Sequence, residues 1–204
     1  NTNWEGAFRV PCLLRWPGMV EPNSICNEIV GSHDFLPTLV HAAGEPDVMD
    51  KLKSGYEANG KTYKVHIDGY DMSPYLTGEE EEHSRPGFLY FSDDGDILAM
   101  RYHNWKIVFM EQETKGTLYL WMHPFLTLRT PKIFNLRTDP FEYADITSNT
   151  YYDSILRHEY LFVPAQKLVG DFLATFEEFP PRQKAASFSL SDVLKKLQSG
   201  IGSK

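Results

Sequence analysis

The sequence predicts a mixed protein: an α/β segment followed by an antiparallel β-sheet with a packed C-terminal helix. The first part joins a short apolar run at 10–14 to a helix-spaced apolar segment at 32–43. After Pro86 the pattern changes to short apolar strands separated by turn residues, which is typical of an antiparallel meander. We therefore expect two parts, residues 1–85 and residues 86–204.

Composition indicates a folded globular protein and excludes several classes of function. Of the 204 residues, 42% are hydrophobic and 14% aromatic, too many for a disordered chain. The net charge of −8 and the lack of a basic stripe argue against nucleic-acid binding. No apolar run approaches the roughly 18 residues needed to cross a bilayer, so we expect no membrane partner. Cys12 and Cys26 show neither a disulfide framework nor a metal spacing, and we expect Cys12 to be buried.

The first stretch is predicted to be a glycine-containing loop that leads into a buried strand. Residues 9–15 carry the apolar run and are expected to form one strand of a mainly parallel sheet. Glu5 and Arg9 are four residues apart at the entrance to this strand. We expect them to form an ion pair that fixes the loop to the domain.

A helix is predicted from Ser32 to Ala43, with Ser32 as its cap. Its apolar stripe consists of Phe35, Leu36, Leu39 and Val40. His33 and His41 could share a helical face, but no third ligand is close in sequence. We therefore interpret them as ordinary surface or core histidines.

The segment from 47 to 85 is expected to contain loops, one short strand and one short helix. Residues 47–63 are polar and predict a surface excursion, and 64–68 predict a short strand. The loop 68–71 does not have the spacing of an EF-hand, so we expect aspartate-capped turns ahead of a short helix at 73–76. The acidic run at 79–82 predicts a solvated loop and a subdomain boundary.

Alternation and turn residues predict the elements of the second part. The expected strands are 88–91, 97–102, 105–110 and 132–136, with 117–122 either a further strand or an insertion bearing aromatic residues. Residues 164–176 predict an amphipathic helix packed across the sheet, and 191–198 predict a last short helix.

Several motifs resemble one known family. Residues 4–11, Trp-Glu-Gly-Ala-Phe-Arg-Val-Pro, followed by Trp-Pro-Gly at 16–18, resemble the Glu-Gly-Gly-x-Arg-x-Pro segment of the formylglycine-dependent sulfatases, the arylsulfatase family. Ala7 stands where that family usually has a second glycine. Further similar segments follow in the family's order, at 34–44, 68–76, 104–108 and 134–142. The resemblance implies that 1–85 is the end of an alkaline-phosphatase-like α/β domain, and that 86–204 is its C-terminal sheet subdomain.

The resemblance also implies a reaction, the hydrolysis of sulfuric esters such as sulfated carbohydrates or aryl sulfates. In that family a formylglycine made from a Cys/Ser-x-Pro-x-Arg motif is the nucleophile, and a calcium ion lies beside it. Neither Cys12 nor Cys26 stands in such a motif, and the family's sulfate-binding lysine lies just ahead of the position of Asn1. We therefore expect a C-terminal fragment that is inactive by itself. Formylglycine and calcium are expected in the parent enzyme. We expect no catalytic nucleophile and no metal-binding residue in the present chain.

Three residues are candidates for contacts with a substrate. In the family, the C-terminal subdomain sends a loop toward the active site, and the stretch 121–129 occupies a comparable place. We expect Trp121 and His123 to border the substrate, His123 as a contact to the leaving group, and Arg129 to meet an anionic group. The alternative is that Trp121 and Phe125 are core aromatics and that His123 is exposed.

Partners and location follow from the same resemblance. We expect the missing N-terminal sulfatase region as a partner, self-association through an exposed apolar edge, and a sulfated small molecule or glycan as substrate. The family resemblance implies that the parent enzyme is periplasmic or secreted. Two alternatives remain: a phosphoester or phosphonate hydrolase of the same superfamily, and a non-catalytic binding or assembly module.

Overall fold

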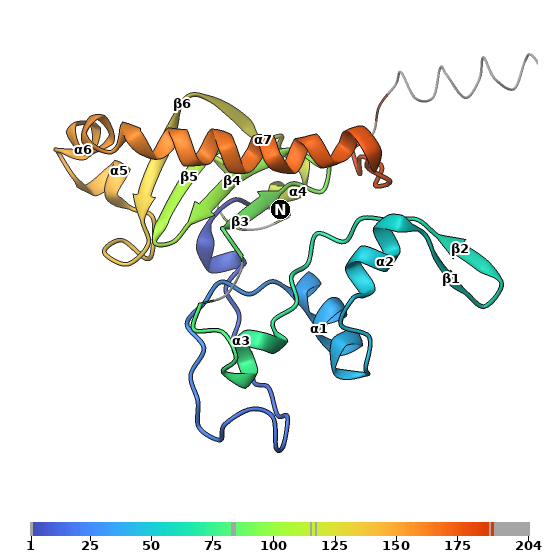
Figure 1. Ribbon diagram of the computed structural model, residues 1–204. Coiled ribbons are helices and arrows are strands. Elements are labelled where there is room, and N and C mark those ends of the chain that lie inside the picture. Colours follow the sequence, from blue (N-terminus) through green and yellow to red (C-terminus); the bar gives the residue numbers. More distant parts are fainter. Residues whose placement is uncertain (1, 83–84, 115, 117, 188, 190–204) are drawn as a thin grey trace, which may run out of the picture.

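The computed structural model describes residues 2–82, 85–114, 116, 118–187 and 189. Its first part carries short helices and a hairpin, and its second part carries a four-stranded sheet with helices around it (Figure 1). The elements of the first part are η1 (Glu5–Ala7), η2 (Ser32–Asp34), α1 (Phe35–Ala42), α2 (Val48–Ser54), β1 (Tyr56–Ala58), β2 (Lys61–Tyr63) and α3 (Ser73–Thr77). Those of the second part are β3 (Phe88–Phe91), β4 (Ile97–Tyr102), β5 (Trp105–Glu111), α4 (Tyr119–Met122), β6 (Leu126–Asn135), α5 (Ala144–Thr147), α6 (Tyr151–Arg157), η3 (Glu159–Leu161) and α7 (Phe162–Glu178).

The four-stranded sheet is antiparallel throughout, in the order β3-β4-β5-β6. The register places Met100 opposite Ile107 and Ile107 opposite Ile133, so one face of the sheet is a row of apolar side chains. Helix α7 lies across the sheet (Figure 1), and its Phe172 ring packs 5.4 Å from that of Phe91. This confirms the expected meander and its covering helix.

The other face of the sheet is covered by the N-terminal loop. Trp4 packs edge-on against Phe134 at 6.3 Å between ring centroids, and Phe8 packs against Tyr90 at 4.8 Å. Because both faces are covered, the central strands are buried almost without interruption along 98–100 and 106–108.

The expected parallel strand at 9–15 is wrong. This segment is irregular and largely exposed, and the Leu13 side chain is 100% exposed. A β-strand exists only when a neighbouring strand accepts and donates its backbone hydrogen bonds, and none of the described residues pairs with this run. Cys12, expected to be buried, is exposed for the same reason.

Smaller differences concern the first part of the chain. The predicted helix at 32–43 is present as η2 followed by α1, but the Asp34 carboxylate, not Ser32, accepts the backbone N–H of Gly31 at its start. Leu36 and Leu39 of its apolar stripe are exposed. The polar segment 47–63 contains helix α2 and the hairpin β1-β2, and 64–68 is not a strand.

In the second part, residues 119–122 form helix α4 within an insertion between β5 and β6, so the insertion alternative holds and the strand alternative is wrong. Strand β6 begins six residues earlier than expected, at Leu126. The predicted last helix, 191–198, lies outside the described residues. None of the described helices is long and apolar enough to cross a membrane.

Candidate functional site

Glu5 anchors the N-terminal loop to the sheet. Its carboxylate is buried, where it accepts hydrogen bonds from the Tyr90 hydroxyl and, at 3.0 Å, from Nη1 of Arg101. Arg9, the expected partner, is exposed and forms no ion pair among the described residues. The cation that pairs with Glu5 is therefore Arg101 of β4, and not Arg9 as the spacing in the sequence predicts.

Lys106 completes this anchor from inside the sheet. Its side chain is fully buried; Nζ donates to the backbone oxygen of Asn3 and lies 2.8 Å from Oε1 of Glu142. Burial lowers the pKa of Lys106 and raises the pKa of Glu142. The remaining oxygen of Glu142 accepts the backbone N–H of Glu5, so one carboxylate ties the loop to the buried lysine.

Gln112 connects the loop to the insertion that carries His123. Its backbone N–H donates to Oδ1 of Asn3 at 3.0 Å, and its side-chain Nε2 donates to the backbone oxygen of His123 at 3.0 Å. Gln112 and Asn3 are both buried. Asn3, directly ahead of the segment 4–11, and the 121–129 stretch are more than a hundred residues apart in sequence, and Gln112 joins them by hydrogen bonds.

The three predicted substrate contacts are all at the surface. Trp121 lies on α4 and is 67% exposed, His123 follows α4 and is exposed, and Arg129 is exposed on β6. The His123 ring lies edge-on to Tyr119 at 6.3 Å. Trp121 is thus not a core aromatic, whereas Phe125 packs half-buried against the core. The roles of these residues stay predictions.

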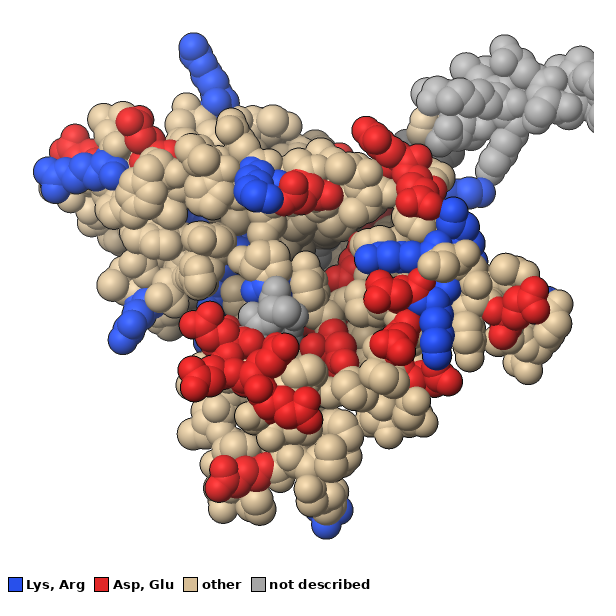
Figure 2. Space-filling model, in the orientation of Figure 1, with Lys and Arg blue, Asp and Glu red and all other residues tan. Residues whose placement is uncertain are grey.

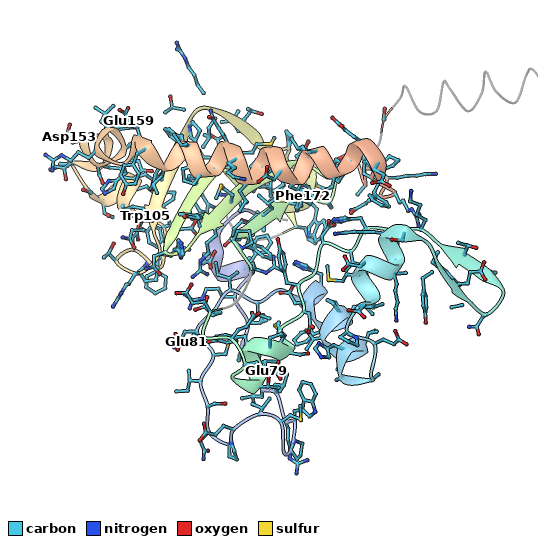
Figure 3. The ribbon with its side chains drawn as sticks, in the orientation of Figure 1. Glu79, Glu81, Trp105, Asp153, Glu159 and Phe172 are labelled. Atoms are coloured by element: carbon cyan, nitrogen blue, oxygen red, sulfur yellow. The ribbon has the colours of Figure 1, made fainter. Side chains whose placement is uncertain are left out.

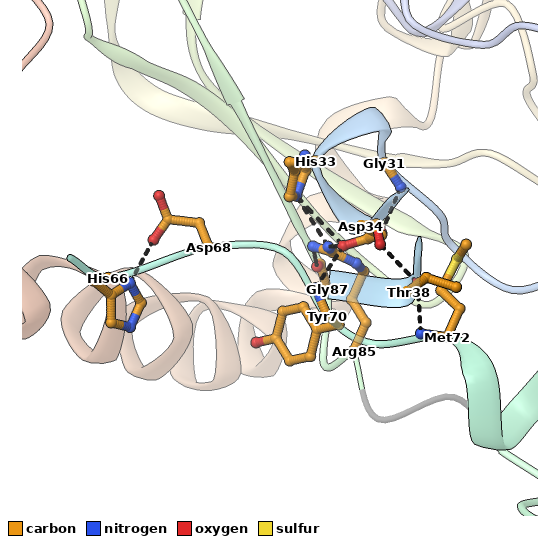
Figure 4. Close-up of polar contacts among 10 residues, drawn as sticks. All are labelled: Gly31, His33, Asp34, Thr38, His66, Asp68, Tyr70, Met72, Arg85 and Gly87. Atoms are coloured by element: carbon orange, nitrogen blue, oxygen red, sulfur yellow. Dashed lines mark hydrogen bonds and ion pairs between the residues drawn. The ribbon is translucent and has the colours of Figure 1, made fainter. Parts of the chain in front are cut away.

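A second polar junction joins the first part of the chain to the start of the sheet (Figure 4). Asp34 is fully buried, and its carboxylate pairs with Arg85 and accepts the backbone N–H of Tyr70 at 2.7 Å. His33 accepts from Nη2 of Arg85 at 2.9 Å. Burial lowers the pKa of His33, which favours the neutral ring that can act as this acceptor.

The loop 68–71 closes tightly over this junction. The Met72 N–H donates to Oγ1 of Thr38, and the Asp71 carboxylate accepts the N–H of Ser73 at 2.9 Å, as the sequence predicts. His41 contacts Asp71, so the two histidines His33 and His41 serve separate contacts and do not form a pair of ligands.

A cleft of about 820 Å³ lies beside this junction, between α7, β3 and the segment 66–70. None of the three predicted substrate contacts lines it. Among the residues described, no three His, Cys, Asp or Glu side chains gather as metal ligands do.

Sequence reasoning missed Lys106, Gln112 and Arg85. A signal existed for the first: a lysine in the middle of the apolar run 105–110 must either disturb the strand or find a buried carboxylate. Gln112 and Arg85 lie in segments with no periodicity, and only the fold shows which distant groups they meet.

Comparison with known proteins finds sulfatases. Steryl-sulfatase of Mus musculus is 33% identical over 102 residues, which is 50% of this chain and 14% of that protein. Steryl-sulfatase of Rattus norvegicus is 28% identical over 193 residues, 87% of this chain and 30% of that protein. Arylsulfatase A of Homo sapiens is 32% identical over 114 residues, 54% of this chain and 19% of that protein. No family model matches the chain.

Among solved structures, the chain is similar to the PsFucS1 sulfatase from Pseudoalteromonas sp., with a TM-score of 0.45 and 25% identity over 56% of this chain and 22% of that one. The chain thus spans less than a third of the length of the relatives reported above.

Proposed function

This chain is related in sequence to the sulfatases, and on that premise we propose that it is the C-terminal part of an enzyme that hydrolyses sulfuric esters. The single observation that carries the proposal is the similarity to steryl-sulfatase that extends over 87% of the chain. The proposed substrates of the parent enzyme are sulfated carbohydrates or aryl sulfates. A secreted or periplasmic parent is proposed on the same basis.

The junction at Gln112 supports a role for the 121–129 stretch in this activity. Through Gln112 it ties the backbone of His123 to Asn3, which directly precedes the segment 4–11 that resembles the sulfatase motif. A residue fixed to that loop is held near the segment that, in the resembling family, carries the sulfate-binding lysine. In this proposal His123 contacts the leaving group, Trp121 stacks on a sugar or aryl ring, and Arg129 meets an anionic group.

The described residues supply scaffold and pocket wall in this proposal, not the nucleophile. Cys12 and Cys26 are exposed and lie outside a formylglycine motif, and no calcium ligands gather among the described residues. Formylglycine and calcium are therefore proposed for another part of the parent enzyme. The chain by itself is proposed to be inactive.

The missing partner is proposed to cover an apolar surface on the first part of the chain. Val10, Leu13, Leu36 and Leu39 are exposed although each is a large apolar side chain. In the parent enzyme the N-terminal sulfatase region would cover them. In the isolated chain a second copy would do so.

The test uses the complete protein and an aryl sulfate substrate. His123→Ala is expected to lower kcat/KM by about 100-fold or more, as the loss of a group that assists proton transfer does. Met122→Ala, at the neighbouring residue, which is also exposed, is the matched control and should leave kcat/KM unchanged. An unchanged kcat/KM in His123→Ala would remove the proposed contact to the leaving group.

A further inference from the structure

The cleft beside α7 has several aromatic side chains in its lining. Figure 2 shows the molecule hollowed below α7, toward the part that carries α2. The ring-bearing residues of its lining include Phe8, Tyr70, Phe88, Phe91, Tyr102 and Phe172. A volume of about 820 Å³ is within the range of small-molecule sites, which span roughly 300–1,000 Å³.

These rings are not simply parts of the core. Phe8 is 36% exposed and Phe91 is 37% exposed, and both line the cleft. Phe91 stacks at a tilt against Phe172, which Figure 3 shows beneath α7. Two ion pairs lie at the edges of the cleft: Lys64 pairs with Glu178 of α7 at 2.8 Å, and Arg85 of the lining pairs with the buried Asp34. Of the two, only the pair of Arg85 with Asp34 is buried, and it holds the wall that carries Tyr70 and Arg85 in place.

Among the charged side chains that line the cleft, Lys53 is the one cation without an ion pair among the described residues. Three cations, Lys53, Arg85 and Lys167, stand against two carboxylates, Asp68 and Asp171. Lys167 pairs with Asp171 at 2.6 Å, and Asp68 contacts Nδ1 of His66 at 3.0 Å.

Arg85 is occupied by Asp34, whereas Lys53, which is half-buried, forms none of the ion pairs found among the described residues. An aromatic cleft that carries an unmatched lysine is complementary to an anion with an aromatic body.

We propose that this cleft binds an organic anion with a flat aromatic body, with its rings against the aromatic walls and its anionic group on Lys53. The aromatic body gains from burial and from offset or edge-on contacts with the rings. The anionic group gains a charge-assisted hydrogen bond from the ammonium of Lys53. The proposal does not depend on sulfatase activity, because the cleft holds none of the residues proposed to contact the hydrolysed ester.

The test is calorimetric titration of the whole chain with 2-naphthalenesulfonate. The probe carries a C–S bond, not a sulfate ester, so binding cannot be confused with turnover. Lys53→Met removes the charge but keeps the apolar stem, and it is expected to weaken binding of the sulfonate about tenfold. Neutral 2-naphthol should bind the wild-type chain and Lys53→Met equally. Lys61→Met, on exposed strand β2 outside the lining, should leave both affinities unchanged.

A second variant tests the walls of the cleft. Phe91→Leu removes one half-exposed ring while keeping an apolar side chain, and it should weaken both the sulfonate and 2-naphthol, with the far-ultraviolet circular dichroism unchanged. Failure of the wild-type chain to bind 2-naphthalenesulfonate at millimolar concentration would overturn the proposal. Equal affinity of wild type and Lys53→Met for the sulfonate would also overturn it.

Discussion

Lys106 is the residue on which the anchoring of the N-terminal loop depends. It is fully buried and contacts Glu142 and the backbone of Asn3, while its ammonium lies 4.4 Å from the centre of the Tyr90 ring. A buried ion pair contributes little net stability, but removing one partner leaves the other charge uncompensated. The pair therefore specifies where the loop sits.

Glu142→Gln tests this anchor. The variant leaves the buried ammonium of Lys106 with only the more distant carboxylate of Glu5, at 3.7 Å, so the free energy of unfolding is expected to fall by about 3 kcal/mol. Urea denaturation measures it. The control is Glu178→Gln, which removes the exposed pair with Lys64 and should change stability by at most ~0.5 kcal/mol. Equal losses in the two variants would show that the buried pair does not hold the loop.

Asp71 gives the protein a pH dependence of defined sign. Burial by itself would raise its pKa, but hydrogen bonds from His41 and Ser73 outweigh burial and hold the pKa below the usual 3.8. Because the folded-state pKa is the lower one, this contribution to stability is present above pH 3.8. It is lost as the pH falls through the folded-state pKa.

Asp71→Asn removes that titration. Urea unfolding of wild type and variant between pH 5 and pH 2 should show a shallower loss of stability in Asp71→Asn. Parallel curves over this range would mean that the contact of Asp71 with His41 and Ser73 does not contribute to folding.

At the scale of single residues, the sequence identified Glu5 as a charge that fixes the loop but assigned it the wrong partner. Spacing along the chain favours Arg9, whereas the fold brings Arg101 beside Glu5 across 96 positions. The Asp71 turn was predicted correctly because its hydrogen bond to Ser73 is local. Local contacts can be inferred from spacing, and long-range ion pairs cannot.

At the scale of elements, Gly69 joins the loop 68–71 to the start of α1. A Cβ at this position would lie 2.1 Å from the backbone oxygen of His33, which cannot move without displacing η2. Gly69→Ala is therefore expected to lower the free energy of unfolding by about 1–3 kcal/mol, as overpacking does.

Gly170→Ala is the matched control, because nothing lies within 4 Å of the added Cβ and the residue is inside α7. There the substitution should raise the free energy of unfolding by roughly 0.5–1 kcal/mol, since alanine favours a helix interior. If Gly69→Ala proved as stable as wild type in thermal denaturation, the loop 68–71 would not pack against the backbone of His33.

The elements of the second part were predicted well because antiparallel neighbours follow one another along the chain. Alternation and turn residues mark each strand, and His103, with a φ of 50°, makes the tight turn between β4 and β5. Strand β6 was predicted too short because Pro131 interrupts it. Proline is tolerated there because β6 is an edge strand of the four-stranded sheet.

At the scale of the whole molecule, the first part exposes an apolar surface. Leu13 and Leu39 are examples, and both lie where the sequence predicted burial in a parallel α/β domain. The division at 85/86 stays a prediction. The four acidic residues after α3, of which Figure 3 labels Glu79 and Glu81, lie near it.

Self-association tests that surface. The isolated chain is expected to be oligomeric in size-exclusion chromatography with light scattering, and Leu13→Asp combined with Leu39→Asp should shift it toward monomer, because both exposed side chains become charged. Leu156→Asp, at a comparably exposed leucine on α6, is the control and should leave the oligomers intact. A wild-type chain that stays monomeric at high concentration would contradict this.

The central claim is that the chain is part of an enzyme for sulfuric esters, and the most direct measurement compares two esters. The protein encoded by the complete reading frame is incubated with 4-nitrophenyl sulfate and, separately, with 4-nitrophenyl phosphate. We predict release of 4-nitrophenol from the sulfate. Hydrolysis of the phosphate alone would favour a phosphoester hydrolase, and hydrolysis of neither would favour a binding module; either result would contradict the claim.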